Sequence, residues 1–107
     1  MLKFIVVAYR RPDWSPEQFR GYFHDVHGPL ALAIPGLRRY VQNFVVPDER
    51  RQPPWDAVIE FWFDDVSSME AAWQSAEGRR ATADNAACMD LGRTRWSVVD
   101  ELIVRPG

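Results

Sequence analysis

The 107-residue sequence predicts an α+β protein with the element order β-α-β-β-α-β. Four segments have the length and composition of strands, namely residues 2–9, 37–46, 55–63 and 96–104. Two helical patterns lie between them, and each opens on a serine that has Gln or Glu three positions later. This order favours a four-stranded antiparallel sheet with its helices on one face.

The first strand and the start of the first helix carry clear local signals. Residues 2–9 are mostly apolar at odd and even positions alike, as in a strand that is covered on both faces. The helix should begin at Ser15, because a cap serine, a proline at the first helical position and Gln18 occur in the expected order.

The first helix should present one apolar stripe to the core, formed by Phe19, Tyr22, Phe23, Val26 and Leu30. His27 falls on the border of this stripe, and His24 lies farther towards solvent. Gly28-Pro29 follows, where we expect the helix to end, kink or restart. A helix end at this point would favour the protonated form of His27 through the helix dipole.

The third strand, residues 55–63, follows a proline-rich loop at residues 47–54. Its odd positions are all apolar and should meet the helices, namely Trp55, Ala57, Ile59, Phe61 and Phe63. Its even positions mix apolar and acidic side chains, namely Asp56, Val58, Glu60 and Trp62.

The second helical region should begin at Ser67, with Glu70 completing a capping box, and should break at Gly78. Residues 79–88 read as helical again, and residues 96–104 close the sheet. The completed order is the ferredoxin-like arrangement. We expect one domain over residues 1–107, because the sequence contains no internal repeat or linker.

Composition excludes several classes of protein. The net charge is −2 and the arginine doublets are scattered among acids, so we expect no nucleic-acid partner. Cys88 is the single cysteine, which excludes an internal disulfide, and its alanine and methionine neighbours favour a buried filler. No segment is apolar enough for a membrane span or a signal peptide, so we expect a cytoplasmic protein.

The pattern on the helix-free face of the sheet indicates that this face is covered by a partner surface. Val58 and Trp62 would be exposed there beside Asp56 and Glu60, a mixture that suits a partly enclosed, semi-polar cavity. We therefore expect a homodimer formed through these faces, with a small hydrophobic ligand between the sheet and the partner surface. The alternative is that both carboxylates pair with arginines at a solvated sheet edge.

Two stretches resemble a known family. The first is Tyr22…His27-Gly28-Pro29-Leu30-Ala31, followed by Ile34-Pro35-Gly36-Leu37 and Tyr40-Val41, and the second is residues 55–64. Both resemble the EthD-like family of the dimeric α+β barrel superfamily. In the related methylmuconolactone isomerases, a histidine at the end of the first helix has an assigned acid/base role. The resemblance implies that role for His27, whereas His24 should be a surface residue.

The candidate site is one for proton transfer without a cofactor. Phosphate-binding loops, dinucleotide fingerprints, nucleophile elbows and His-x-x-x-His pairs are absent from the sequence. His27 would be the general acid/base, and Asp56 or Glu60 would orient it or take a second proton. The pocket would be lined by Tyr22, Tyr40, Trp62 and Tyr9. The alternatives are a capping or packing role for His27 and core or rim packing for the tyrosines.

Metal and haem are not expected. His24 and His27 are three residues apart on a helix, but no third ligand lies nearby in the sequence. Other members of the wider superfamily bind haem through a histidine, but EthD-like proteins are not known as haem enzymes.

Three hypotheses for function follow. The first is a cofactor-independent enzyme that acts on a hydrophobic carbonyl compound or lactone by isomerisation, polyketide aldol cyclisation or a related rearrangement. The second is a non-catalytic binding or accessory protein, because the founding EthD protein is associated with ether degradation alongside an oxygenase system. The third is a stress-responsive dimer without a defined ligand.

Overall fold

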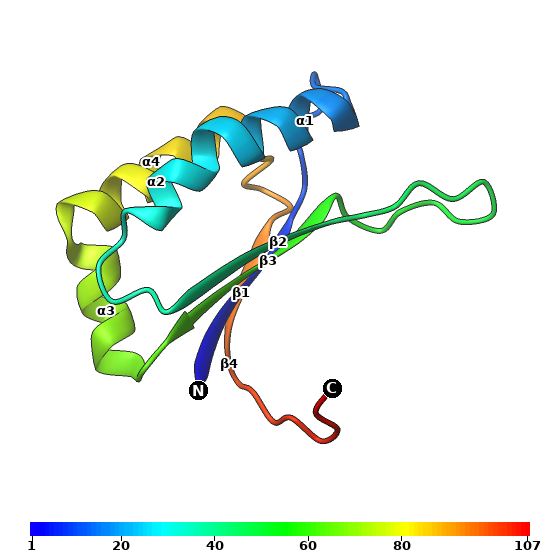
Figure 1. Ribbon diagram of the computed structural model, residues 1–107. Helices are drawn as coiled ribbons and strands as arrows, with labels where there is room; N and C mark the ends of the chain where they lie inside the picture. Colours follow the sequence, from blue (N-terminus) through cyan, green and yellow to red (C-terminus); the bar gives the residue numbers. More distant parts are fainter.

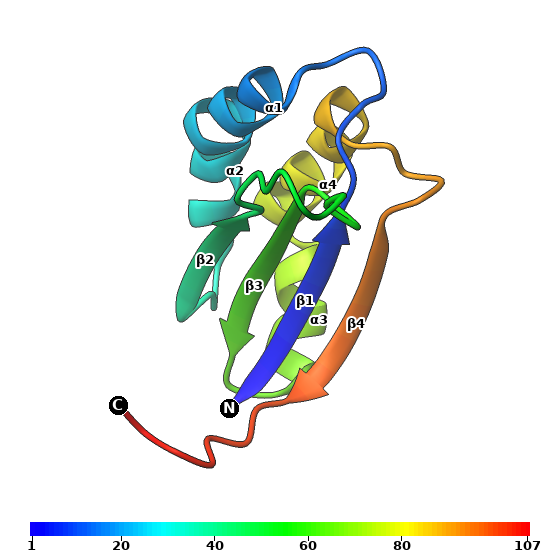
Figure 2. The ribbon, with the colours of Figure 1, turned by 90° about the vertical axis from the view of Figure 1, so that its right-hand side faces the viewer.

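The computed structural model describes residues 1–107 as one antiparallel sheet with all helices on one face (Figures 1 and 2). The strands are β1 (Leu2–Ala8), β2 (Arg39–Phe44), β3 (Ala57–Phe63) and β4 (Arg95–Asp100), in the spatial order β2-β3-β1-β4. Every neighbouring pair is antiparallel. The expected ferredoxin-like fold is confirmed.

The helices form two connected groups behind the sheet in the view of Figure 2. The first group is α1 (Pro16–Tyr22), a π-helical turn η1 (Phe23–His27) and α2 (Gly28–Leu32). The second group is α3 (Val66–Gln74) and α4 (Ala76–Cys88). No helix combines the length and the apolar character that crossing a membrane requires.

The start of α1 is the predicted capping box. The Gln18 backbone N–H donates to Ser15 Oγ at 3.1 Å, and the Ser15 N–H donates to Gln18 Oε1 at 2.8 Å. Two amide groups that the first turn leaves without helical partners are thus satisfied reciprocally.

At Gly28-Pro29 the helix restarts, which is one of the three expected outcomes. The Gly28 N–H donates to the carbonyl of Phe23, which closes the wider π-helical turn before α2 begins. Pro29 lies in the first turn of α2, where a missing N–H costs little. The expectation that a helix C-terminus acts on His27 was wrong, because α2 continues beyond it.

Two expectations for the second helical group are corrected. Asp65, not Ser67, caps α3, since the Ser68 N–H donates to Asp65 Oδ1 at 2.7 Å. The break lies at Ser75, which ends α3 and caps α4 by accepting from the Gly78 N–H at 3.0 Å. Gly78 lies inside α4, where a Cβ would come within 2.0 Å of the Ala72 carbonyl oxygen.

The core lies between the sheet and the helices, as the alternation in the third strand predicts. Ala57, Ile59, Phe61 and Phe63 are buried there among side chains from the helices. The predicted strand was too long at its start, because β3 begins at Ala57 and Trp55 is 37 % exposed.

The opposite sheet face has no helix over it (Figure 1). The last strand ends at Asp100 and not at Val104, and the following residues run past the end of the sheet. Three consecutive side chains there are largely exposed, namely Leu102, Ile103 and Val104.

Candidate functional site

The π-helical turn η1 places His27 inside the protein. The wider turn contains an extra residue, which rotates His27 away from the border position that a regular helix would give it. His27 is 4 % exposed, and its ring packs on the Phe23 ring with centroids 4.6 Å apart. Turns of this kind often occur at functional sites.

Asp84 of α4 holds His27 in place. Its Oδ2 lies 2.8 Å from Nδ1 of His27, and its Oδ1 accepts the hydroxyl proton of Tyr22 at 2.7 Å. The hydrogen bond to this carboxylate, reinforced by burial, raises the pKa of Tyr22 to about 12. One carboxylate thus joins two side chains of the first helical group to α4.

Sequence reasoning missed Asp84. It is the one acidic residue between Arg79 and Cys88, in an alanine-rich helix. It lies three residues after Ala81 and four before Cys88, both of which are buried. That spacing places Asp84 on the inward face of the helix. A lone carboxylate on the apolar face of a predicted helix was the available signal.

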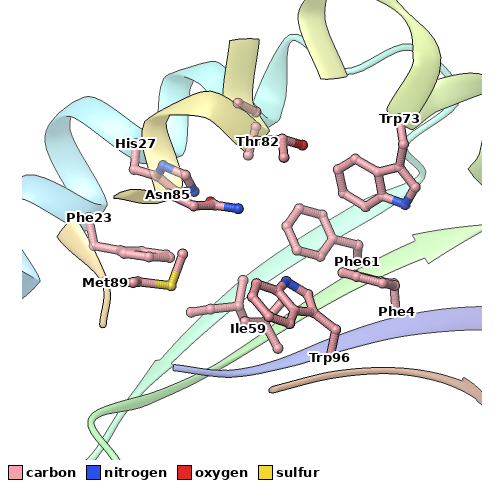
Figure 3. A pocket seen from close by; sticks show the side chains of 13 residues that line it. Phe4, Phe23, His27, Ile59, Phe61, Trp73, Thr82, Asn85, Met89 and Trp96 are labelled. Carbon is pink, nitrogen blue, oxygen red and sulfur yellow. The ribbon is translucent and has the colours of Figure 1, made fainter. Parts of the chain in front are cut away.

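His27 opens onto a narrow cavity between the helices and the sheet (Figure 3). The cavity has a volume of about 30 Å³, which is room for about two water molecules. Its wall is mostly apolar and includes Phe4, Phe23, Ile59, Phe61, Trp73, Met89 and Trp96. Trp96 is 44 % exposed because no helix covers β4, so this indole forms a wall that borders solvent.

His27 and Asn85, which lie side by side in the cavity wall, each have polar side-chain atoms without a hydrogen-bond partner in the protein. The hydrogen bond of His27 engages Nδ1, which leaves Nε2 free, and the amide of Asn85 lies beside the imidazole (Figure 3). The hydroxyl of Thr82, in contrast, donates to the Gly78 carbonyl at 2.9 Å. The cavity therefore combines an apolar wall with an imidazole nitrogen and an amide that are free to bind a ligand.

Cys88 lies close to His27 and Asp84. It is fully buried, as the sequence predicted, and burial together with the charge of Asp84 raises the pKa of its thiol to about 12. Donor atoms of His27, Asp84 and Cys88 lie within 4.8 Å of one another. Because both carboxylate oxygens are engaged in hydrogen bonds and the thiol stays protonated, the cluster favours a hydrogen-bonded network over a metal site.

Asp56 and Tyr9 lie at a different place. Both line a cleft at the end of the sheet, together with Arg10 and the proline-rich loop. Asp56 pairs with Arg10, with Oδ1 2.6 Å from Nη1, and its Oδ2 accepts the Arg10 N–H at 2.9 Å. The Asp56–Arg10 pair agrees with the alternative of an arginine partner at the sheet edge, whereas the expected role of Asp56 as a partner of His27 is wrong.

Glu60 and Trp62 lie on the helix-free face. Glu60 pairs with Lys3 at 2.8 Å and accepts from the Asn43 amide at 2.8 Å. Burial alone would raise the pKa of Glu60, but these two partners outweigh it and lower the pKa. The expectation that Trp62 is exposed on this face was wrong, because Trp62 is 6 % exposed, its ring lies against Lys3 and Arg39, and it donates to Glu101 at 3.1 Å. Glu60 therefore cannot orient His27, which lies on the other side of the sheet.

The other residues singled out in the sequence divide between core and surface. Tyr40 accepts a hydrogen bond from Gln42 at 2.9 Å, and burial raises the pKa of its phenol to about 12. It packs on Phe61 outside the His27 cavity. His24 is exposed beside Asp25, as expected. Of the predicted pocket residues, Tyr22 alone joins the His27 network.

This geometry suits proton transfer at Nε2. A carboxylate that accepts the Nδ1 proton fixes the tautomer of an imidazole and leaves the Nε2 lone pair directed at the cavity. The same carboxylate stabilises the imidazolium that forms when Nε2 takes a proton.

Fold and site together define a small ferredoxin-like α+β protein with a buried His–Asp pair. The EthD domain family model matches residues 11–92, so the chain belongs to the EthD family.

Solved structures share this fold. An EthD-family protein from Bacillus halodurans is 24% identical, with a TM-score of 0.81 over 95% of this chain and 99% of that chain. A dimeric ferredoxin-like protein from Bacteroides fragilis is 14% identical, with a TM-score of 0.70 over 94% of this chain and 95% of that chain. SnoaB from Streptomyces nogalater, a cofactor-independent oxygenase whose structure is that of a mutant, is 12% identical, with a TM-score of 0.63 over 94% of this chain and 91% of that chain.

Proposed function

We propose that this protein is a cofactor-independent enzyme that moves protons on a hydrophobic carbonyl compound or lactone. The observation that carries the proposal is the buried His27, whose Nδ1 is bonded to Asp84 while Nε2 is free in an apolar cavity. Isomerisation and cyclisation are the reactions that such a proton carrier serves best.

In the proposed reaction, His27 acts first as a base and then as an acid. Nε2 takes a proton from the carbon next to the carbonyl group, and the electron pair of the broken C–H bond forms an enolate. Asp84 stabilises the resulting imidazolium at 2.8 Å. His27 then returns the proton to another atom of the substrate, so no oxidant or reductant is required. General acid/base assistance of this kind contributes roughly 10²- to 10⁴-fold in rate.

Chemistry without a cofactor is known for a protein with this fold. SnoaB, which has the same fold, is described as a cofactor-independent oxygenase. The likeness extends to the fold alone, because the two chains are 12% identical. The case for this chain therefore depends on its own histidine and cavity.

The test needs no knowledge of the natural substrate. Cyclopentanone in D₂O exchanges its α-hydrogens when a base removes them, and NMR measures the rate. We expect the wild-type protein to accelerate exchange above buffer and His27→Gln to lose at least about 100-fold of that acceleration. His24→Gln is the matched control, since His24 is exposed, and should keep the wild-type rate. Equal exchange by the wild type and His27→Gln would refute the role of His27.

A binding or accessory protein is the second candidate, and the size of the cavity favours it. A volume of about 30 Å³ holds about two water molecules, so a substrate with a ring requires the wall to open. Saturable binding of cyclopentanone without accelerated exchange would support this candidate over the enzyme.

We also infer a homodimer formed by the helix-free sheet faces. The exposed side chains of Leu102, Ile103 and Val104 beside this face support a partner surface there. The sequence pattern had suggested a ligand between the sheet and this partner. The position of His27 leads us to propose instead that the ligand binds on the helix side of the sheet.

A further inference from the structure

We propose that the side-chain amide of Asn85 binds the carbonyl oxygen of the ligand while His27 faces the neighbouring carbon. This inference rests on the proposed function, because it assigns the polar contact that orients a ligand in the His27 cavity. It makes Asn85 the residue that selects carbonyl compounds over apolar molecules of the same shape.

Asn85 directly follows the His27 partner Asp84 on α4. Asp84 turns its carboxylate towards His27, and the next side chain along α4 enters the same cavity (Figure 3). Nothing in the protein accepts from or donates to the half-buried Asn85 amide, although the surrounding wall is mostly apolar. The amide is not completely buried, so water can be its partner in the free protein. When a ligand displaces that water, the ligand must provide the partner. A ligand oxygen would supply that partner.

Other donors of the cavity are less suitable. The Thr82 hydroxyl proton is already used in its bond to Gly78. The indole nitrogen of Trp73 is buried without a partner, but the Trp73 ring packs on Phe4, Phe61 and Phe63, and its nitrogen points away from His27 in Figure 3. The indole N–H of Trp96 also has no partner in the protein, but this side chain comes from the sheet and is 44 % exposed. Asn85 is thus the free donor beside the His27 imidazole (Figure 3).

The pairing of an amide donor and an imidazole base has a defined chemical use. When His27 removes the α-proton, negative charge develops on the carbonyl oxygen. An N–H group aimed at that oxygen stabilises the enolate more than the neutral ketone. Asn85 would therefore contribute to the specificity of binding and to the rate.

Two probes of nearly the same shape isolate the contact. Cyclopentanone and methylenecyclopentane differ in one oxygen that is replaced by a CH₂ group. The affinity of each is measured for wild-type protein and for Asn85→Leu by NMR titration of the His27 and Met89 signals. We expect the substitution to lower the affinity for the ketone relative to the alkene by about 2- to 10-fold, which is the range of a single hydrogen bond.

The control is Gln74→Leu, which also replaces an amide by leucine but lies at the end of α3 outside the cavity. It should leave the affinity ratio unchanged. The infrared C=O band of bound cyclopentanone gives a second readout, since a hydrogen bond lowers its frequency. That lowering should be present in wild-type protein and absent in Asn85→Leu.

The outcomes separate the two proposals. If both probes bind and neither the affinity ratio nor the C=O band depends on Asn85, the role of Asn85 is overturned while the cavity remains a binding site. If neither probe perturbs the His27 signals, the cavity does not take carbonyl compounds and the proposed function fails with it.

Discussion

At the scale of single residues, the site depends on a carboxylate that the sequence did not reveal. His27 was identifiable from its place beside Gly28-Pro29 and from the family resemblance. Its partner was not, because the contact with Asp84 joins residues 57 positions apart. The spacing from Ala81 and Cys88 indicates that Asp84 faces inward, but no local pattern shows which distant residue it contacts. Asp56 and Glu60 were nearer to the expected pocket in the predicted sheet, but each has a basic partner elsewhere.

The raised pKa of the Cys88 thiol predicts how the free energy of unfolding depends on pH. Its pKa is raised from 9.0 to about 12, so the unfolded chain loses this proton at lower pH than the native protein does. Between about pH 9 and pH 12 the native state binds more protons, and the free energy of unfolding must fall as pH rises. Each such group contributes about 1.4 kcal/mol per pH unit in that window.

The comparison is between wild-type protein and Cys88→Ala, with urea unfolding measured from about pH 7 to about pH 11. The substitution should lower stability by a constant amount below about pH 9, because it leaves a cavity. Above that pH the wild-type curve should fall more steeply, so the two curves converge. Parallel curves over the whole range would show that Cys88 titrates alike in both states.

At the scale of elements, local signals predicted the start of α1 but neither the cap of α3 nor the break between α3 and α4. The start of α1 followed from Ser15 and Gln18, whose interaction is complete within one helical turn. The break between α3 and α4 did not follow from Gly78, because that glycine is needed for close approach to Ala72. A glycine that ends a helix and one that lets two helices touch have the same local sequence signal.

This difference predicts opposite effects for two helical glycines. Gly78→Ala should lower the free energy of unfolding by about 1–3 kcal/mol or more, because the new Cβ would meet backbone atoms of α3. Gly21→Ala in α1 meets nothing within 4 Å and should raise stability by about 0.5–1 kcal/mol through helix propensity. Urea unfolding of both variants measures the difference. Stabilisation by Gly78→Ala would mean that α3 and α4 do not approach as described.

At the scale of the whole molecule, the alternation in the third strand predicted which sheet face the helices cover. The sequence could not predict which cavity His27 would enter, because that depends on how the π-helical turn rotates the ring. A regular helix and a π-helical turn have no distinguishing pattern in these residues. The side chains that the sequence had combined into one site therefore lie in four places: the His27 network, the cleft at the end of the sheet, the helix-free face and the core around Tyr40.

The proposed homodimer, formed through the helix-free sheet faces, can be tested by substitution. Val58→Lys would bring a charge into the proposed contact between two sheets and should weaken dimer formation at least about tenfold. Val66→Lys is the matched control, because Val66 is exposed at the start of α3 and should not affect association. Sedimentation equilibrium measures both. A wild-type protein that remains monomeric at micromolar concentration would contradict the proposed homodimer.

The proposed chemistry requires that Asp84 fix the imidazole so that Nε2 is the reactive nitrogen. A long-range ¹H–¹⁵N NMR correlation of the His27 ring, recorded at alkaline pH where an imidazole is neutral, reports which nitrogen carries the proton. We expect a proton on Nδ1 and a lone pair on Nε2 in the wild type, and a mixture of the two tautomers in Asp84→Asn. A wild-type ring with its proton on Nε2 would contradict the proposed role of the His27–Asp84 pair.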